Sequence, residues 1–148
     1  MSKQQGFTLA ELMVVIAIIA ILSSIGLPAW QGYLRKAALT DMLQAMVPYK
    51  TAVDLCALES GDIAGCSAGS QGIPDGKSSR YISKIVVDKG VITLSGQSTL
   101  QGLSVALTPK RESDSDGLRW TRRCAVAAGS ENLQAACQDV FRFDDSAG

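Results

Sequence analysis

The sequence contains no histidine. Histidine is the usual general base of enzymes and the commonest metal ligand in proteins. Its absence argues against triad or Cys-His catalysis. The 14 basic and 14 acidic residues cancel, so no overall field favours nucleic acid or an acidic partner. These absences predict a protein that is not an enzyme and needs no cofactor.

Charge is also missing from a long internal stretch, because no residue between Leu12 and Leu34 is ionisable as Asp, Glu, Lys or Arg. A helix of about 20 apolar residues crosses the roughly 30 Å hydrocarbon core of a bilayer. Glu11 stands at the start of this stretch, where a carboxylate in lipid costs on the order of 2–3 kcal/mol. The sequence therefore predicts a membrane-crossing helix whose one acid needs compensation.

Two ordinary interpretations leave Glu11 unexplained. A cleaved signal peptide could use Met1 and Lys3 as its positive region and the small-x-small triplet Ser24-Ile25-Gly26 as its cleavage site. However, the uncharged stretch continues past 26, and Glu11 interrupts its start. In a plain single-pass membrane anchor, the Glu11 carboxylate would cost free energy in the lipid and serve no purpose.

A third interpretation uses both the short polar leader and the acid. A cut between Gly6 and Phe7 would place a new amine on Phe7, one helical turn before Glu11. An amine and a carboxylate buried at similar depth neutralise each other, either within one chain or between neighbouring chains. We favour this interpretation because it gives Glu11 a partner.

Residues 6–11, which read Gly-Phe-Thr-Leu-Ala-Glu, resemble the processing site of type IV prepilins and related pseudopilins. The resemblance implies that a prepilin peptidase cuts after Gly6 and N-methylates Phe7. It also implies that Thr8 and Glu11 serve assembly, with Glu11 pairing with the Phe7 amine of a neighbour. Residues 33–56 and 139–145 extend the resemblance over the whole chain. They narrow it to type IVa major pilins, those of enterobacteria in particular.

The resemblance also implies partners and a location. The subunit waits in the bacterial inner membrane with its domain in the periplasm. An assembly platform, with minor pilins, then extracts it into a helical homopolymer on the cell surface. In this family the long helix tends to unwind near Pro28 in the filament. The chain departs from many relatives by carrying Ala20 where they carry glycine, which puts the extent of that unwinding in doubt.

A single helix is expected to join membrane and domain. Residues 1–6 form the leader, 7–34 the apolar transmembrane and filament-core helix, and 35–58 an amphipathic continuation. Gly26 and Pro28 predict a break in the helix, either a simple kink or local melting of a turn, and Pro48 predicts a bend. The buried stripe steps by three and four residues, as a helix face requires, through Leu39, Met42, Met46, Tyr49, Val53 and Cys56.

Four cysteines behind an export segment predict disulfides formed in an oxidising compartment. Three pairings are open. We favour the two local ones, Cys56–Cys66 and Cys124–Cys137, because each closes a small loop within one structural unit. Zinc binding is disfavoured because the spacings are not C-x-x-C and no histidine is present.

The remaining residues, 59–148, predict a globular domain. A Gly/Ser-rich loop at 59–80 precedes four segments with strand character at 81–88, 91–95, 103–108 and 118–124. Asp88-Lys89-Gly90 is expected to close a tight hairpin, 132–136 a short helical turn, and Phe141 and Phe143 a final extended piece. An antiparallel sheet with one apolar face would cover the helix stripe, which gives an α+β fold.

Two charged clusters carry weaker expectations. Asp114 and Asp116 lie in an acidic run like the first half of a calcium loop, but its twelfth position is Arg123, so the EF-hand pattern fails. We favour an acidic turn. The resemblance keeps one less favoured alternative, because related major pseudopilins hold calcium in a loop of the sheet region and Asp114 and Asp116 could do so here. A basic cluster could attract DNA along a filament, although a solvated face or ion pairs between subunits are favoured. It comprises Lys110, Arg111, Arg119, Arg122 and Arg123 around Trp120.

The function expected is that of a major type IV pilus subunit. One alternative is a pseudopilin of a type II secretion system, which would form a short periplasmic fibre. A less favoured alternative is a membrane-tethered periplasmic binding domain, whose resemblance at Gly6-Phe7 would be coincidental.

Overall fold

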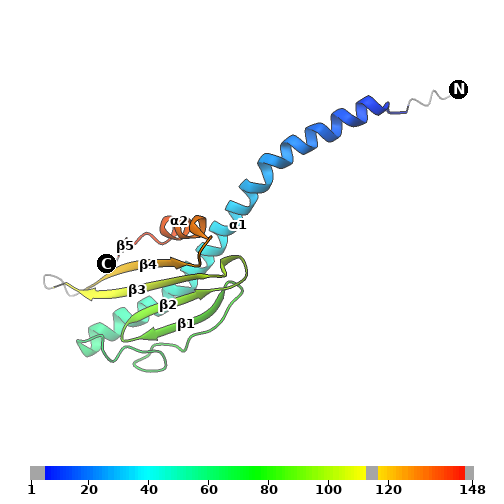
Figure 1. Ribbon diagram of the computed structural model, residues 1–148. Coiled ribbons are helices and arrows are strands. Elements are labelled where there is room, and N and C mark those ends of the chain that lie inside the picture. Colours follow the sequence, from blue (N-terminus) through cyan, green and yellow to red (C-terminus); the bar gives the residue numbers. More distant parts are fainter. Residues whose placement is uncertain (1–5, 113–116, 146–148) are drawn as a thin grey trace. The chain divides into compact units, whose positions relative to one another are not determined.

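The computed structural model describes residues 6–112 and 117–145 and has an α+β fold (Figure 1). The chain divides into two units, Met1–Leu34 and Arg35–Gly148. One long helix runs through the boundary, and a small sheet follows it. In order, the elements are α1 (Leu9–Ser60), β1 (Ile82–Asp88), β2 (Val91–Gly96), a 3-10 turn (Ser98–Leu100), β3 (Leu103–Arg111), β4 (Leu118–Val126), α2 (Glu131–Val140) and β5 (Asp144–Asp145).

The second half of α1 lies across one face of the sheet (Figure 1). All six residues of the predicted stripe are buried there, together with Ala38 and Ala57. They pack against the inward-facing side chains of β1 to β4, among them Ile92, Leu94 and Val105. The prediction that a one-sided sheet covers the helix stripe is confirmed.

Helix α1 ends two residues beyond the predicted Leu58. Gly61 follows its last residue in the left-handed region with φ 74°, and its N–H donates to the Ala57 carbonyl at 3.0 Å. Glycine adopts this conformation without the steric cost that a Cβ would bring. Gly61 therefore ends the helix after Ser60.

Local melting at Gly26 and Pro28 is absent from the single subunit, because α1 is helical without interruption through both residues and through Pro48. A proline removes one backbone hydrogen bond and strains the preceding turn, at a cost of about 3 kcal/mol. The turns on either side of each proline keep their own hydrogen bonds, and here they hold the helix. Unwinding in a fibre stays a prediction.

The sheet is a meander with the strand order β1-β2-β3-β4-β5, antiparallel from β1 to β4. The predicted hairpin between β1 and β2 is confirmed, since Asp88 pairs with Val91 across the two residues Lys89 and Gly90. Both of these residues have positive φ, at 50° and 83°. This two-residue turn has the twist that suits a hairpin.

Strand β3 is three residues longer than predicted, and it continues through Pro109 to Arg111. Its pairing with β2 ends at Leu107, whereas its pairing with β4 continues to Arg111. Pro109 therefore lies where β3 is bordered on one side only. Proline is tolerated at such an edge because its missing N–H would face away from the partner strand.

The C-terminal region is more ordered than the sequence indicated. The turn predicted at 132–136 is the ten-residue helix α2, and the final segment adds β5 parallel to β4. Phe141 is fully buried and packs in the common core. The final extended piece expected at Phe141 and Phe143 lies later than predicted, because those residues connect α2 to β5 and the strand itself is Asp144–Asp145.

Candidate functional site

The start of α1 is fixed by two reciprocal hydrogen bonds. The Thr8 N–H donates to Oε2 of Glu11 at 3.2 Å, and the Glu11 N–H donates to Oγ1 of Thr8 at 3.2 Å. With the helix beginning at Leu9, Thr8 is its N-cap and Glu11 its third residue. This arrangement is a capping box, which satisfies two backbone donors that the helix itself leaves unpaired.

Gly6 and Phe7 precede the helix, so the expected cleavage bond lies in non-helical chain. Phe7 is 89% exposed, and apart from the two chain neighbours of Gly6 no heavy atom of the described residues lies within 4 Å of where a Cβ on Gly6 would stand. In this chain, the Phe7 nitrogen is the amide of the peptide bond to Gly6. The structure thus places Gly6, Phe7, Thr8 and Glu11 together at one accessible end.

The apolar side chains of α1 before Leu34 are exposed throughout. Within the described residues, α1 is the one helix long and apolar enough to cross a membrane, and none of its most apolar window is buried. Monomeric soluble proteins rarely expose a contiguous apolar surface of this extent. The N-terminal unit therefore requires a cover of lipid or of other helices.

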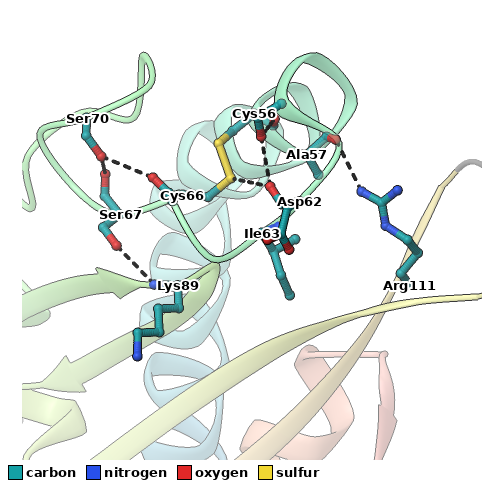
Figure 2. Close-up of a disulfide and its surroundings, with 11 residues drawn as sticks. Cys56, Ala57, Asp62, Ile63, Cys66, Ser67, Ser70, Lys89 and Arg111 are labelled. Atoms are coloured by element: carbon teal, nitrogen blue, oxygen red, sulfur yellow. Dashed lines mark hydrogen bonds between the residues drawn. A yellow bond between two sulfur atoms is a disulfide. The ribbon is translucent and has the colours of Figure 1, made fainter.

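Both predicted disulfides are confirmed. Cys56–Cys66 joins the last turns of α1 to the loop that follows, with 6.0 Å between the two Cα atoms (Figure 2). The loop is then tied to the β1–β2 turn, since Lys89 N–H donates to Oγ of Ser67 and Gly90 N–H donates to the Cys66 carbonyl. Arg111 of β3 donates to the Ala57 carbonyl near the end of α1. These contacts connect helix, loop and sheet at one end of the domain.

Replacing Cys56 and Cys66 together by serine is expected to lower the free energy of unfolding by about 2–4 kcal/mol. In the chain-entropy account, the disulfide acts by restricting the unfolded loop, while the loop's hydrogen bonds to Lys89 and Gly90 remain in the folded state. Urea unfolding of the full chain in mild detergent, followed by circular dichroism, measures the change. An unchanged midpoint would show that the loop is held without the disulfide.

The second disulfide, Cys124–Cys137, connects β4 to α2. The same region is held by Arg122, a buried cation on β4. Its Nη1 donates to the carbonyls of Gln138 and Phe141, at 2.8 and 2.9 Å, where α2 ends. A cation at a helix C-terminus satisfies exposed carbonyls and complements the helix dipole.

Arg122→Met is expected to lower the free energy of unfolding by about 1.5–3 kcal/mol, because methionine fills similar space but donates no hydrogen bond to the α2 carbonyls. Arg123→Met is the matched control, since Arg123 is the next residue of β4 and is exposed. The control is expected to unfold like the parent chain. Equal losses in the two variants would contradict this role of Arg122.

The predicted basic cluster is divided: Lys110, Arg119 and Arg123 share the exposed face of the sheet, but Arg122 does not. Arg122 faces the core, whereas its neighbours Arg119 and Arg123 are exposed. Arg119 forms ion pairs with Asp144 at 2.7 Å and Glu112 at 3.0 Å. Hydrogen bonds to Asp144 and then to Glu112 raise the pKa of its guanidinium above the ordinary value. DNA binding by this cluster stays a prediction that is not favoured.

The predicted acidic turn lies partly outside the described residues, because Asp114 and Asp116 belong to the undescribed range 113–116. Among residues 6–112 and 117–145, no group of three His, Cys, Asp or Glu side chains is placed to hold a metal ion.

Comparison with known proteins agrees with the geometry of the helix start. A family model described as the prokaryotic N-terminal methylation motif matches residues 1–27. The chain is 60% identical over 146 residues to prepilin peptidase-dependent protein D of Escherichia coli strain K12, which covers 99% of each chain. It is 34% identical over 150 residues to the type IV major pilin protein PilE1 of Neisseria gonorrhoeae, which covers 95% of this chain and 82% of the relative. This chain belongs to the type IV pilin family.

The fold of this pilin is similar to the solution NMR structure of the major type IV pilin PpdD from enterohemorrhagic Escherichia coli. The TM-score is 0.68 at 52% identity, with 78% of this chain and 90% of that chain covered. Family and fold class are thus confirmed as predicted from residues 6–11 and from the helix stripe. The pilin is a structural protein of a family made as precursors that are processed and assembled into filaments, and it is not an enzyme.

Sequence reasoning missed two features of the pilin. The capping box was readable, because Thr8-x-x-Glu11 before an apolar run is its signature, but the acid was considered only as a partner for an amine. The contact of Arg122 with α2 was not readable, because it joins residues on β4 to a helix end formed by later sequence.

Proposed function

We propose that the chain is the major subunit of a type IV pilus. A prepilin peptidase cuts between Gly6 and Phe7 and N-methylates Phe7. The mature subunit stays in the inner membrane with its domain in the periplasm, until an assembly platform and minor pilins draw it into a surface filament. The observation that carries the proposal is the exposed apolar half of α1, with one carboxylate in its first turn.

The capping box adds a second role for Glu11. Its Oε2 accepts the Thr8 N–H, and a carboxylate has further acceptor positions on its two oxygens. After cleavage, a charged amine on Phe7 would lie immediately before the N-cap, within reach of this carboxylate or of one on a neighbouring chain. Thr8 would then hold Glu11 in place while the amine neutralises it.

In the fibre, the pair of Glu11 and the Phe7 amine would determine the axial position of each subunit more than it would raise the stability of the fibre. Moving an apolar helix from lipid into a bundle of like helices gains little hydrophobic free energy, because both surroundings are apolar. A carboxylate in that interior is costly unless it meets a positive charge. Subunits would therefore stop at the axial position where each Glu11 meets an amine.

One experiment separates this function from the alternatives. Material sheared from the cell surface is imaged by electron microscopy, and its pilin is sequenced from the N-terminus. The proposal predicts long fibres whose subunits begin at N-methylated Phe7. A processed chain found only in the envelope would favour a pseudopilin, and an unprocessed monomer beginning at Met1 would favour the tethered domain.

A further inference from the structure

The aromatic residues of the N-terminal unit stand only at the two ends of its apolar stretch. Phe7 lies at one end and Trp30 and Tyr33 at the other, and no aromatic residue occurs between them. The side chains of Trp30 and Tyr33 are 60% and 70% exposed, so the protein core does not hold them. Tryptophan and tyrosine concentrate at the two boundaries between a bilayer and water.

The spacing of these ends matches a bilayer. Because α1 is unbroken at Gly26 and Pro28, the regular rise of a helix applies from Glu11 to Trp30. At 1.5 Å per residue, this segment is about 28 Å long, and the hydrocarbon core is about 30 Å thick. When Trp30 lies at one boundary, Glu11 lies at the opposite one.

The direction of the Glu11 side chain strengthens this placement. Its carboxylate reaches back to the Thr8 N–H, towards the start of the helix and away from the apolar stretch. Side chains of a helix generally tilt towards its N-terminus, which here carries the charge out of the hydrocarbon.

We infer that Trp30 and Tyr33, here called the aromatic anchor, bind the phospholipid headgroup region on the periplasmic side and set the depth of the waiting subunit. This inference rests on the membrane stage of the proposed function. The anchor holds Glu11 and the Gly6–Phe7 bond at the cytoplasmic boundary, where water reaches both. The bond is then accessible for cleavage, and the carboxylate remains hydrated.

The aromatic anchor also determines when Glu11 needs a partner. At the boundary, the carboxylate has water and the Thr8 N–H. Drawing the subunit outward removes the anchor from its headgroups and carries Glu11 into the apolar interior. The demand for a neighbour's amine therefore arises during extraction, so Glu11 pairs with the fibre and not with other waiting subunits.

Thiol accessibility in inner-membrane vesicles of either orientation, prepared from cells without the assembly platform, tests the depth. All four native cysteines are paired, so a single introduced cysteine is the only free thiol. Ala10→Cys is expected to react with an impermeant maleimide from the cytoplasmic face, and Ala29→Cys to be protected. The relocated-anchor chain combines Trp30→Ala, Tyr33→Ala and Leu27→Trp. This moves the aromatic side chain one helical turn closer to Glu11.

In the relocated-anchor chain, the helix should shift outward by one turn to keep its aromatic residue at the boundary. Labelling of Ala10→Cys should then fall about fivefold or more, and Ala29→Cys should become reactive from the periplasmic face. Leu27→Ala alone is the control, and it should leave both rates unchanged. Unchanged labelling in the relocated-anchor chain would overturn the inference.

Extraction with alkaline carbonate distinguishes a failure of the proposed membrane stage from a failure of the aromatic anchor. A chain that washes out of the membrane would contradict the proposed membrane stage itself. A chain that stays in the membrane, with the same reactive positions wherever the aromatic residue is placed, would contradict the aromatic anchor alone.

Discussion

Glu11→Ala is expected to abolish piliation while leaving cleavage and membrane insertion intact. The substitution removes the one acid of the apolar helix segment and leaves the Phe7 amine of a neighbour without its charge partner inside the fibre. Breaking a buried ion pair by removing one member costs about 3–5 kcal/mol. The pilin recovered in sheared surface fractions should therefore fall by about a hundredfold or more, as measured by quantitative immunoblotting.

Glu11→Gln separates charge from helix capping. Glutamine at the third helical position can still accept the Thr8 N–H, so the capping box is kept, but the negative charge is lost. The pairing account predicts that this variant, too, makes no fibres. Thr8→Ser, which keeps both the cap and the charge, should assemble normally. Normal fibres from Glu11→Gln would show that capping, and not charge pairing, is the role of the acid.

Gly6→Ser is expected to trap the chain in its uncut form. The structure leaves open space around Gly6, so a serine there disturbs no contact of the chain itself. Any loss of cleavage then reflects the peptidase, which must accept the residue before the bond it cuts. Without cleavage, Phe7 keeps an uncharged amide and cannot neutralise Glu11, so fibres should also be absent.

The position of the band on a denaturing gel and the intact mass of the chain measure this outcome. Gln4→Ser is the control, because it changes the leader without changing the residue at the cut. It should be processed like the parent chain. A mature-length product from Gly6→Ser would show that the peptidase does not require glycine before the bond it cuts.

The elements that follow from local patterns were predictable. The stripe through Leu39 and Met46 specified the buried face of α1, because a 3.6-residue period leaves one arrangement that buries it. The Lys89-Gly90 turn specified the β1–β2 hairpin, and the short separations within each cysteine pair favoured the disulfides that form. In each of these examples, the interacting residues are close in the chain or share one periodic element.

The errors have tertiary causes. The length of β3 depends on its pairing with β4, which continues to Arg111 after the pairing with β2 has ended at Leu107, and that limit is set by the neighbouring strand and not by the sequence of β3. The basic cluster around Trp120 divides because strand residues alternate between two faces, which sends Arg122 inward to the end of α2.

The most direct test of the central claim is an electron cryo-microscopy structure of the native fibre, resolved at the start of α1. The account predicts that each Glu11 carboxylate lies within about 4 Å of an N-methylated Phe7 amine, as close ion pairs do, inside an interior without water. Fibres in which that amine points to solvent, or in which the leader is still attached to Phe7, would contradict it.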